Sequence, residues 1–134
     1  MKKTLSLLLC AIMAFSFTAC GGSISNVKIL EWKSQVYSKE EIESAIKVAA
    51  EYFKKGFFGC TLTSITYAGD EKISDYIDWA VRNDADDVIV LISSFDVGRK
   101  GGDGSLNPNS TYDGWMWILV RTKGGNWRHV DHGY

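Results

Sequence analysis

The stretch Asp113-Gly-Trp-Met-Trp-Ile-Leu-Val-Arg-Thr-Lys-Gly-Gly-Asn-Trp-Arg-His-Val-Asp-His-Gly-Tyr134 decides how this chain folds. It predicts a β-hairpin with strands over residues 115–121 and 127–131. The turn falls at residues 123–126, where two glycines supply the positive φ of a tight turn. Successive side chains of a strand point to opposite faces, and both faces of the first strand are apolar, so we expect it inside a sheet covered on both sides. One face carries Trp115, Trp117 and Leu119, and the other carries Met116, Ile118 and Val120.

The first residues of the chain predict an export signal. Lys2-Lys3 is a short cationic start, and the apolar run over residues 4–17 is too short to span a membrane, which takes about 20 apolar residues. The run ends in Phe17-Thr-Ala-Cys20-Gly-Gly, and small residues directly before a cysteine resemble the lipobox of bacterial lipoproteins. That resemblance implies a signal peptide over residues 1–19 and a lipid on Cys20 that anchors the protein to the membrane. The alternative is an ordinary signal peptide with an incidental cysteine.

The residues after Cys20 predict a tether and a location. Residues 21–26 are small and polar, which favours a flexible linker, and we assign residues 20–36 to the lipidated cysteine and its tether. Trp32 is expected to dock on the domain. The anchor predicts an extracytoplasmic, lipid-anchored protein of the cell membrane. Gly21 stands where an Asp would resemble an inner-membrane retention signal, so an outer-membrane destination is permitted in a diderm host.

Composition limits the partners. Removal of residues 1–19 leaves 13 basic and 16 acidic residues and no basic run, so the electrostatic footprint of a nucleic-acid binder is missing. The length that remains suits one domain, assigned to residues 37–134. Cys60 is then the one thiol that neither leaves with the signal nor carries lipid. Its apolar neighbours predict a buried, inert side chain, and no sequence motif indicates a cofactor.

Four further elements follow from local patterns. Ser38 and Glu41 form a capping box, and an apolar stripe from Ile42 to Phe53 predicts a helix over residues 38–55. Residues 61–67 are rich in β-formers and predict a strand. Apolar residues at helical spacing predict a second, shorter helix over residues 71–82. The continuous apolar run over residues 88–95 predicts a buried central strand.

The long connection over residues 96–112 is the first place where function is expected. Its glycines and Pro108 exclude regular structure through most of its length, and a loop this long in a small domain is usually functional or disordered. We favour an ordered binding loop. A calcium loop is rejected, because Pro108 stands where the required glycine should be. The candidate ligand- or partner-binding residues are Asp96, Arg99, Asp103, Asn107, Asn109, Tyr112 and Asp113.

The C-terminal strand offers the second candidate. Strict alternation predicts that His129 and Asp131 share one face and that His132 points away. Two ligands on one strand do not make a metal site without a third from elsewhere, so no metal is predicted. His129 joins the candidate binding residues.

The order helix, strand, helix, strand, long loop and hairpin predicts an α+β fold. We expect a curved antiparallel sheet of about four strands, with the N-terminal helix and a shorter second helix packed on one face. This arrangement resembles the nuclear-transport-factor-2-like (cystatin-like) superfold, where a curved sheet wraps a helix around a cone-shaped cavity.

Several segments are also similar to a family of small uncharacterised bacterial lipoproteins with such a domain, over about residues 37–134. That resemblance brings no activity with it, and fold does not imply function. The segments are Ser38-Lys-Glu-Glu-Ile, Gly59-Cys-Thr-Leu-Thr, Ile92-Ser-Ser-Phe-Asp96, Gly102-Asp-Gly-Ser-Leu-Asn-Pro-Asn-Ser-Thr-Tyr112, and Gly125-Asn-Trp-Arg with Gly133-Tyr134.

The sequence is compatible with three functions. The first is a non-catalytic, membrane-anchored binding module for a small ligand or an envelope protein. The second is a small enzyme of the isomerase or hydrolase kind. It requires Asp96, Tyr112, His129 or Asp131 to converge on one pocket. The third is an inhibitor or immunity-type lipoprotein that blocks another exported protein.

Overall fold

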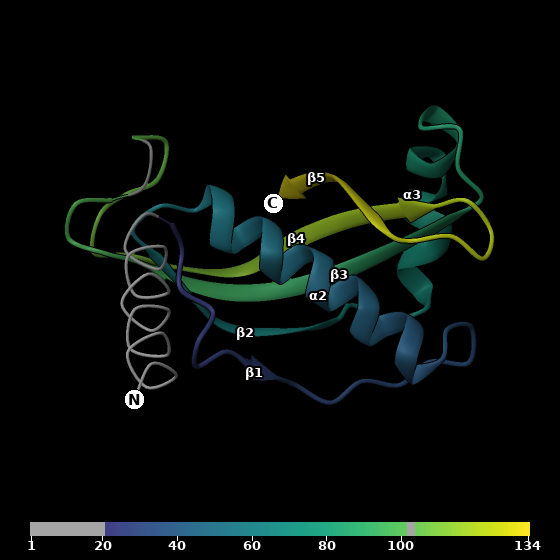
Figure 1. The fold of residues 1–134 in the computed structure, drawn as a ribbon, viewed down its shortest axis with the longest axis horizontal. Helices are drawn as coiled ribbons and strands as arrows, with labels where there is room; N and C mark the ends of the chain where they lie inside the picture. The colour runs from purple at the N-terminus through teal and green to yellow at the C-terminus, as the bar shows by residue number, and fades with distance from the viewer. Residues whose placement is uncertain (1–20, 102–103) are drawn as a thin grey trace, which may run out of the picture.

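The computed structural model describes residues 21–101 and 104–134. The predicted signal peptide, Cys20 and Asp103 lie outside the described residues. The α+β class is confirmed (Figure 1). The elements in chain order are β1 (Lys28–Ile29), α2 (Lys39–Gly56), β2 (Cys60–Tyr67), α3 (Glu71–Arg82), β3 (Asp87–Val97), β4 (Thr111–Arg121) and β5 (Arg128–Gly133).

The five strands form one mixed, open sheet in the order β1-β2-β3-β4-β5. The last four strands pair in antiparallel fashion, as expected. The expectation of about four antiparallel strands is wrong at the other edge. There the two residues of β1 pair in parallel with Ser64 and Ile65 of β2. This strand is too short to be distinguished by its sequence pattern, and it pairs with the edge that β2 presents.

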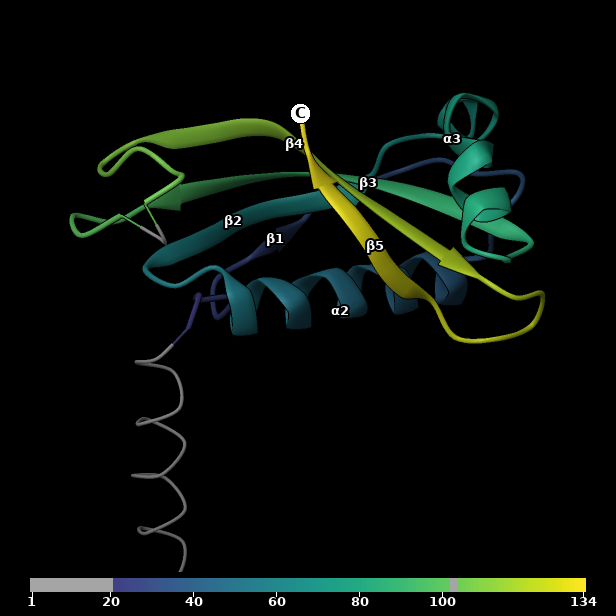
Figure 2. The same cartoon turned by 90° about the horizontal axis from the view of Figure 1, so that it is seen from above.

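The two helices cover opposite faces of the sheet, with α2 on one side and α3 over one end of the other (Figure 2). The expectation that both helices pack on one face is wrong. The physical reason lies in β4, whose two apolar faces both need cover. Trp117 and Leu119 are buried in the main core with α2, whereas Ile118 and Val120 are buried in a second, smaller core with α3.

The start of α2 is held by its cap and by an arginine from β4. Both hydrogen bonds of the Ser38–Glu41 capping box are present, which confirms the predicted helix start. Arg121 of β4 pairs with Glu41, and its Nε lies 2.9 Å from a carboxylate oxygen of Asp87. The same guanidinium lies 4.3 Å from the centre of the Trp127 ring, and Trp127 Nε1 donates to the Glu41 carbonyl oxygen at 3.0 Å. Every polar group named here therefore has a partner.

The segment expected to be a flexible tether is bound to the domain at its first residues. Gly22 is buried, and its N–H donates to the Lys54 carbonyl oxygen at 2.9 Å. Ser23 makes two backbone hydrogen bonds with β2, donating to Cys60 and accepting from Leu62, each at 2.9 Å. Glycine allows this approach, since a Cβ at Gly21 would lie 2.0 Å from the Lys54 carbonyl oxygen. A free linker is therefore wrong for residues 21–23.

Two smaller expectations are confirmed. Trp32 packs against the main core from a partly buried position. Cys60 is 2% exposed, as its apolar neighbours predict. Within residues 21–101 and 104–134, no helix has the length and apolar character needed to cross a membrane.

Candidate functional site

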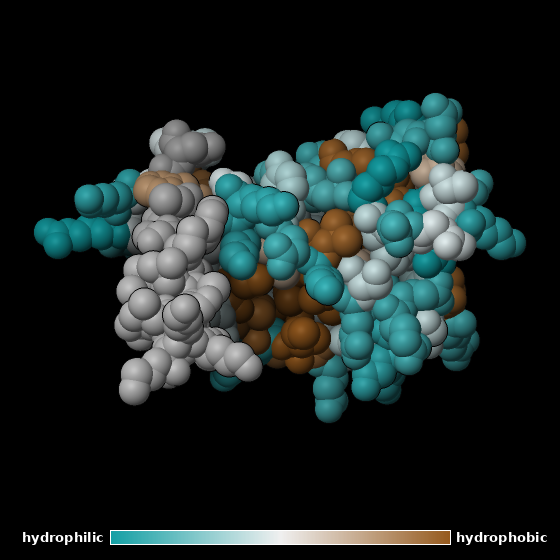
Figure 3. Space-filling view, viewed as in Figure 1, coloured by the Kyte–Doolittle hydropathy of each residue, from teal (hydrophilic) through white to brown (hydrophobic). Residues whose placement is uncertain are grey.

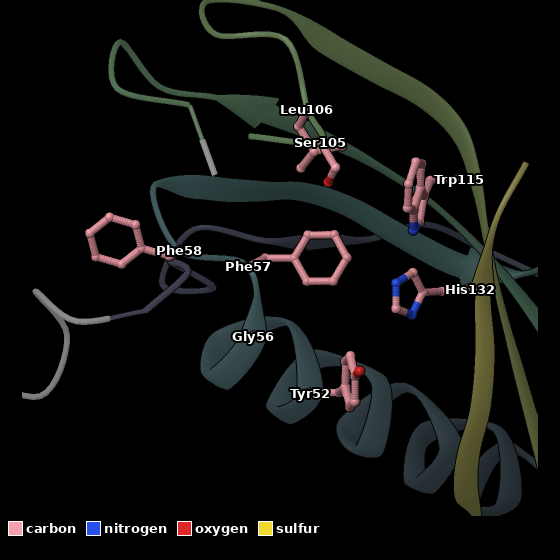
Figure 4. A pocket seen from close by; sticks show the side chains of 8 residues that line it. All are labelled: Tyr52, Gly56, Phe57, Phe58, Ser105, Leu106, Trp115 and His132. Carbon is pink, nitrogen blue, oxygen red and sulfur yellow. The ribbon is translucent and has the colours of Figure 1, made fainter. Parts of the chain in front are cut away.

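The candidate site lies where the last turns of α2 face β4, β5 and the β3–β4 loop. A cavity of about 200 Å³ opens there, and we call it the aromatic pocket (Figure 4). None of its lining side chains is an acid, a lysine or an arginine. The lining residues are Tyr52, Gly56, Phe57, Phe58, Ser105, Leu106, Trp115 and His132.

Trp115 supplies a polar atom that the fold leaves unsatisfied. Its indole Nε1 is buried, and it has no hydrogen-bond partner among the described residues. Figure 4 shows this nitrogen directed into the pocket, on the side of His132 and Phe57. A buried donor without an acceptor costs about 1–3 kcal/mol, so such a group in a native structure calls for an explanation.

The backbone that carries Trp115 is held by a buried serine. Ser93 of β3 is 3% exposed, and its hydroxyl donates to the Trp115 carbonyl oxygen at 3.0 Å. The same hydroxyl accepts from Trp117 Nε1 at 2.8 Å. Trp117 is thus satisfied by the fold, whereas the indole nitrogen of Trp115, two residues earlier on the same face, is left for the cavity.

A β-bulge in β5 brings two histidines to this face. Leu119 pairs with His129, but Ile118 pairs with Asp131, so Val130 is an extra residue in the ladder. The bulge puts His129 and His132 on the same face and Asp131 on the other. The prediction that His129 and Asp131 share a face while His132 points away is therefore wrong.

The two imidazoles form a pair inside an aromatic cluster. His129 Nε2 lies 3.0 Å from His132 Nδ1, so one nitrogen donates and the other accepts. The His129 ring stacks on Tyr52 with 3.9 Å between ring centres, and the His132 ring stacks on Trp115 with 5.8 Å between centres. The contact between the histidines leaves Nε2 of His132 as the ring atom that can meet a molecule in the pocket.

Burial keeps both rings neutral at neutral pH. It lowers the pKa of His129 to about 4, and the neighbouring His132 contributes in the same direction. Burial also lowers the pKa of His132. A neutral pair cannot attract an anion by charge. The pocket therefore offers aromatic surface, an indole N–H donor, an imidazole nitrogen and the hydroxyl-bearing side chains of Tyr52 and Ser105.

The predicted loop residues that the structure describes lie around the pocket and do not line it. Tyr112 comes nearest, because its ring stacks on Phe95 at 5.2 Å and meets Trp115 edge-on at 5.7 Å. Its hydroxyl accepts a hydrogen bond from the Asn107 backbone N–H at 3.0 Å, which helps to order the loop. Asn109 adopts a positive φ of 55° and donates its backbone N–H to the Gly98 carbonyl oxygen.

The charged loop candidates within the described residues are exposed to solvent. Asp96 is exposed and accepts from the Thr111 hydroxyl at 2.7 Å, while Arg99 and Asp113 are exposed on the loop and on β4. His129 lies behind His132 and lines a separate hollow with Tyr52 and Trp127. These candidates therefore do not converge on one binding site.

The set of residues required for an enzyme is also divided. Asp131 lies against the α3 side of the sheet, where it lines a small hollow with Tyr76 and Met116. His129 lies on the α2 side, and Asp96 is exposed on β3 beside the β3–β4 loop. The condition that Asp96, Tyr112, His129 and Asp131 meet in one pocket is not fulfilled. The described residues also contain no group of three His, Cys, Asp or Glu side chains placed to hold a metal ion.

Sequence reasoning missed most of the residues that line the pocket. Tyr52 was outside the apolar stripe of its helix, and Phe57 follows the helix end, so neither has a pattern that indicates a site. His132 was assigned to the wrong face. A signal existed only for Trp115, which the alternation of its strand placed on the same face as Trp117 and Leu119.

No protein-family model, no curated protein and no solved structure matches this chain.

Proposed function

We propose that this chain is a lipid-anchored, extracytoplasmic binding module. Its aromatic pocket holds a small planar molecule, or a side chain of a partner, that carries a hydrogen-bond acceptor. The observation that carries this proposal is the buried, unsatisfied Trp115 Nε1 directed into the cavity. An acceptor oxygen bound there offsets the cost of the unpaired donor, and a ligand without one leaves that cost in place.

The size of the pocket limits the ligand. An apolar cavity of about 150 Å³ accommodates benzene, so the aromatic pocket, at about 200 Å³, has room for one ring and a small polar group. Ring contacts with Phe57, Tyr52 and His132 each contribute about 0.5–1.5 kcal/mol beyond the area they bury. A neutral acceptor such as an amide or ketone suits the site best, because no charged side chain lines the pocket.

The membrane anchor is supported by the sequence. A cationic start, a short apolar run and a small-small-Cys ending occur together and in the order that bacterial lipoprotein signals require. A lipid on Cys20 keeps the pocket within reach of envelope molecules. The acyl chains also bind the bilayer by themselves, so membrane attachment does not depend on contacts between the domain and lipid.

The test uses benzamide as the probe and toluene as the comparison, since both carry one ring and only benzamide has an acceptor oxygen. Binding is followed by the NMR signal of each tryptophan indole N–H in the full chain. We expect benzamide to bind about tenfold more tightly than toluene and to shift the Trp115 signal. We expect Trp115→Phe to remove the preference.

Trp127→Phe is the matched control. It removes an indole N–H that already donates to the Glu41 carbonyl oxygen, so the preference for benzamide should persist. Equal binding of benzamide to the wild type and to Trp115→Phe would contradict the proposed site. So would a benzamide titration that shifts Trp127 and leaves Trp115 unchanged.

A further inference from the structure

Residues 21–23, which pack against the end of α2 and the start of β2, limit how the protein can lie on a membrane. Gly22 and Ser23 are held by backbone hydrogen bonds to Lys54, Cys60 and Leu62, each at 2.9 Å. Cys20 is covalently next to Gly21, and neighbouring Cα atoms are about 3.8 Å apart. A lipid on Cys20 therefore starts within one residue of the end of α2, with no free linker between them.

The close approach is specific to the two glycines. A Cβ at Gly21 would lie 2.0 Å from the Lys54 carbonyl oxygen, and one at Gly22 would lie 2.7 Å from the Phe53 carbonyl oxygen and 2.9 Å from its ring. Both partners belong to the last turns of α2, whose backbone cannot move away without breaking the helix. Gly21-Gly22 therefore attaches the start of the domain to one particular end of the helix.

That end of the molecule has the composition of a membrane-contacting surface. Phe58 follows α2 and is 51% exposed, and Figure 4 shows its ring directed away from the aromatic pocket. Lys54 and Lys55 close the last turn of α2. The β3–β4 loop lies at the same end of the molecule, where Gly98 donates to the Gly59 carbonyl oxygen at 2.9 Å.

The loop adds further cations. Arg99 and Lys100 are exposed there, and Figure 3 shows hydrophilic side chains gathered at the end of the molecule that Figure 1 assigns to this loop. Among the described residues nearby, Glu51, Asp96 and Asp113 carry the opposite charge. Each Lys or Arg at an anionic bilayer strengthens binding about fivefold. An exposed aromatic ring prefers the interface between lipid and water.

We propose that this end, defined by Gly21, Lys54, Lys55, Phe58, Arg99 and Lys100, lies directly on the bilayer to which Cys20 is attached. The proposal rests on the proposed lipid anchor. It assigns the domain a fixed orientation in which α2 points its C-terminal end at the membrane and the turn at residues 123–126 faces away from it. Phe58 borders the aromatic pocket although its ring points outward, so the rim of the pocket then lies near the headgroups.

The test places a spin label at either end of the lipid-modified full chain in vesicles of phosphatidylethanolamine and phosphatidylglycerol. Lys55→Cys marks the membrane end and Lys123→Cys the distal turn. Labelling is selective because Cys60 is 2% exposed. We expect the label at position 55 to be several-fold less accessible to a water-soluble nickel complex than the label at position 123. Equal accessibility, or protection of position 123 instead, would overturn the orientation.

A second variant tests whether the short connection sets the orientation. Insertion of eight Gly and Ser residues between Cys20 and Gly21 should bring the accessibility of the label at position 55 toward that at position 123. An unchanged ratio of the two accessibilities would show that the short connection does not set the orientation. Mass spectrometry of the same samples separates the two proposals. Absence of lipid on Cys20 contradicts the anchor. A lipid on Cys20 with two equally accessible labels contradicts only the orientation.

Discussion

A tryptophan lies near each end of α2, and the two ends differ in how completely their polar groups are satisfied. At the first turn, Arg121 pairs with Glu41 and Asp87, and Trp127 Nε1 donates to a helix carbonyl. At the last turns, Trp115 Nε1 has no acceptor in the described part of the chain and faces a cavity. Each end contains a tryptophan against the helix. The difference indicates that the first end contributes stability, whereas the second keeps a cavity and an unpaired donor.

The comparison is tested most strongly at Arg121. Its side chain is 13% exposed, and Arg121→Ala leaves the carboxylates of Glu41 and Asp87 facing each other without a cation. We expect a loss of about 3 kcal/mol in the free energy of unfolding. This is the lower limit of what the loss of one partner of a buried ion pair costs, because both carboxylates are partly exposed. Urea unfolding measures the loss. A loss below about 0.5 kcal/mol would contradict a stabilising role for this end.

The pH dependence of the free energy of unfolding tests the C-terminal end of α2, where the two histidines are partly buried. The His129 pKa is lowered by burial to about 4, whereas the unfolded chain protonates this ring near pH 6.5. Below pH 6.5 the unfolded state therefore binds the extra proton, and the free energy of unfolding falls as the pH drops toward 4. His132 acts in the same direction. We expect a total loss of about 2 kcal/mol, after a discount for the partial exposure of both rings.

His129→Phe is the control for that prediction, because it keeps a ring against Tyr52 and removes the titrating group. The variant should lose less stability between pH 6.5 and 4.5 than the wild type in urea unfolding. Glu41 and Asp70 titrate in a different window, since hydrogen bonds from the Ser38 and Gln35 backbones hold their pKa values below the usual range. The stability they contribute is lost at lower pH. An unchanged slope in His129→Phe would contradict the assignment.

A smaller effect separates the two tryptophans. Trp127→Phe leaves the Glu41 carbonyl oxygen without its indole donor and Arg121 with a weaker aromatic partner, so we expect a loss of about 1–2 kcal/mol. Trp115→Phe removes a donor that has no partner, so its cost comes only from the smaller ring and should be about 1 kcal/mol or less. Thermal unfolding of both variants checks the order. A larger loss for Trp115→Phe would contradict the comparison.

Much of the fold was predictable because its signals are local. The capping box at Ser38, the bounds of α3 and the opposite faces of β4 depend on residues a few positions apart. The site was predictable only in part. Tyr112 and His129 were named, and they lie beside the pocket. The lining residues Tyr52, Phe57 and His132 come from three elements that meet only in the folded chain.

The errors have one physical origin. The parallel pairing of β1, the docking of residues 21–23 and the bulge at Val130 each depend on what a distant strand or helix presents. One extra residue in β5 was enough to exchange the faces of Asp131 and His132, because side chains of a strand alternate with a period of two. No property of the neighbouring residues encodes that insertion.

The sequence alone determined the α+β class, the positions of the two helices and the double-sided burial of the hairpin strand, since periodicity and capping act over a few residues. The tertiary structure alone decided that the helices cover opposite faces, that two histidines meet and that one indole N–H is left facing a cavity. Those features depend on long-range packing, in which the shape left between α2 and the sheet is set by all of the elements together.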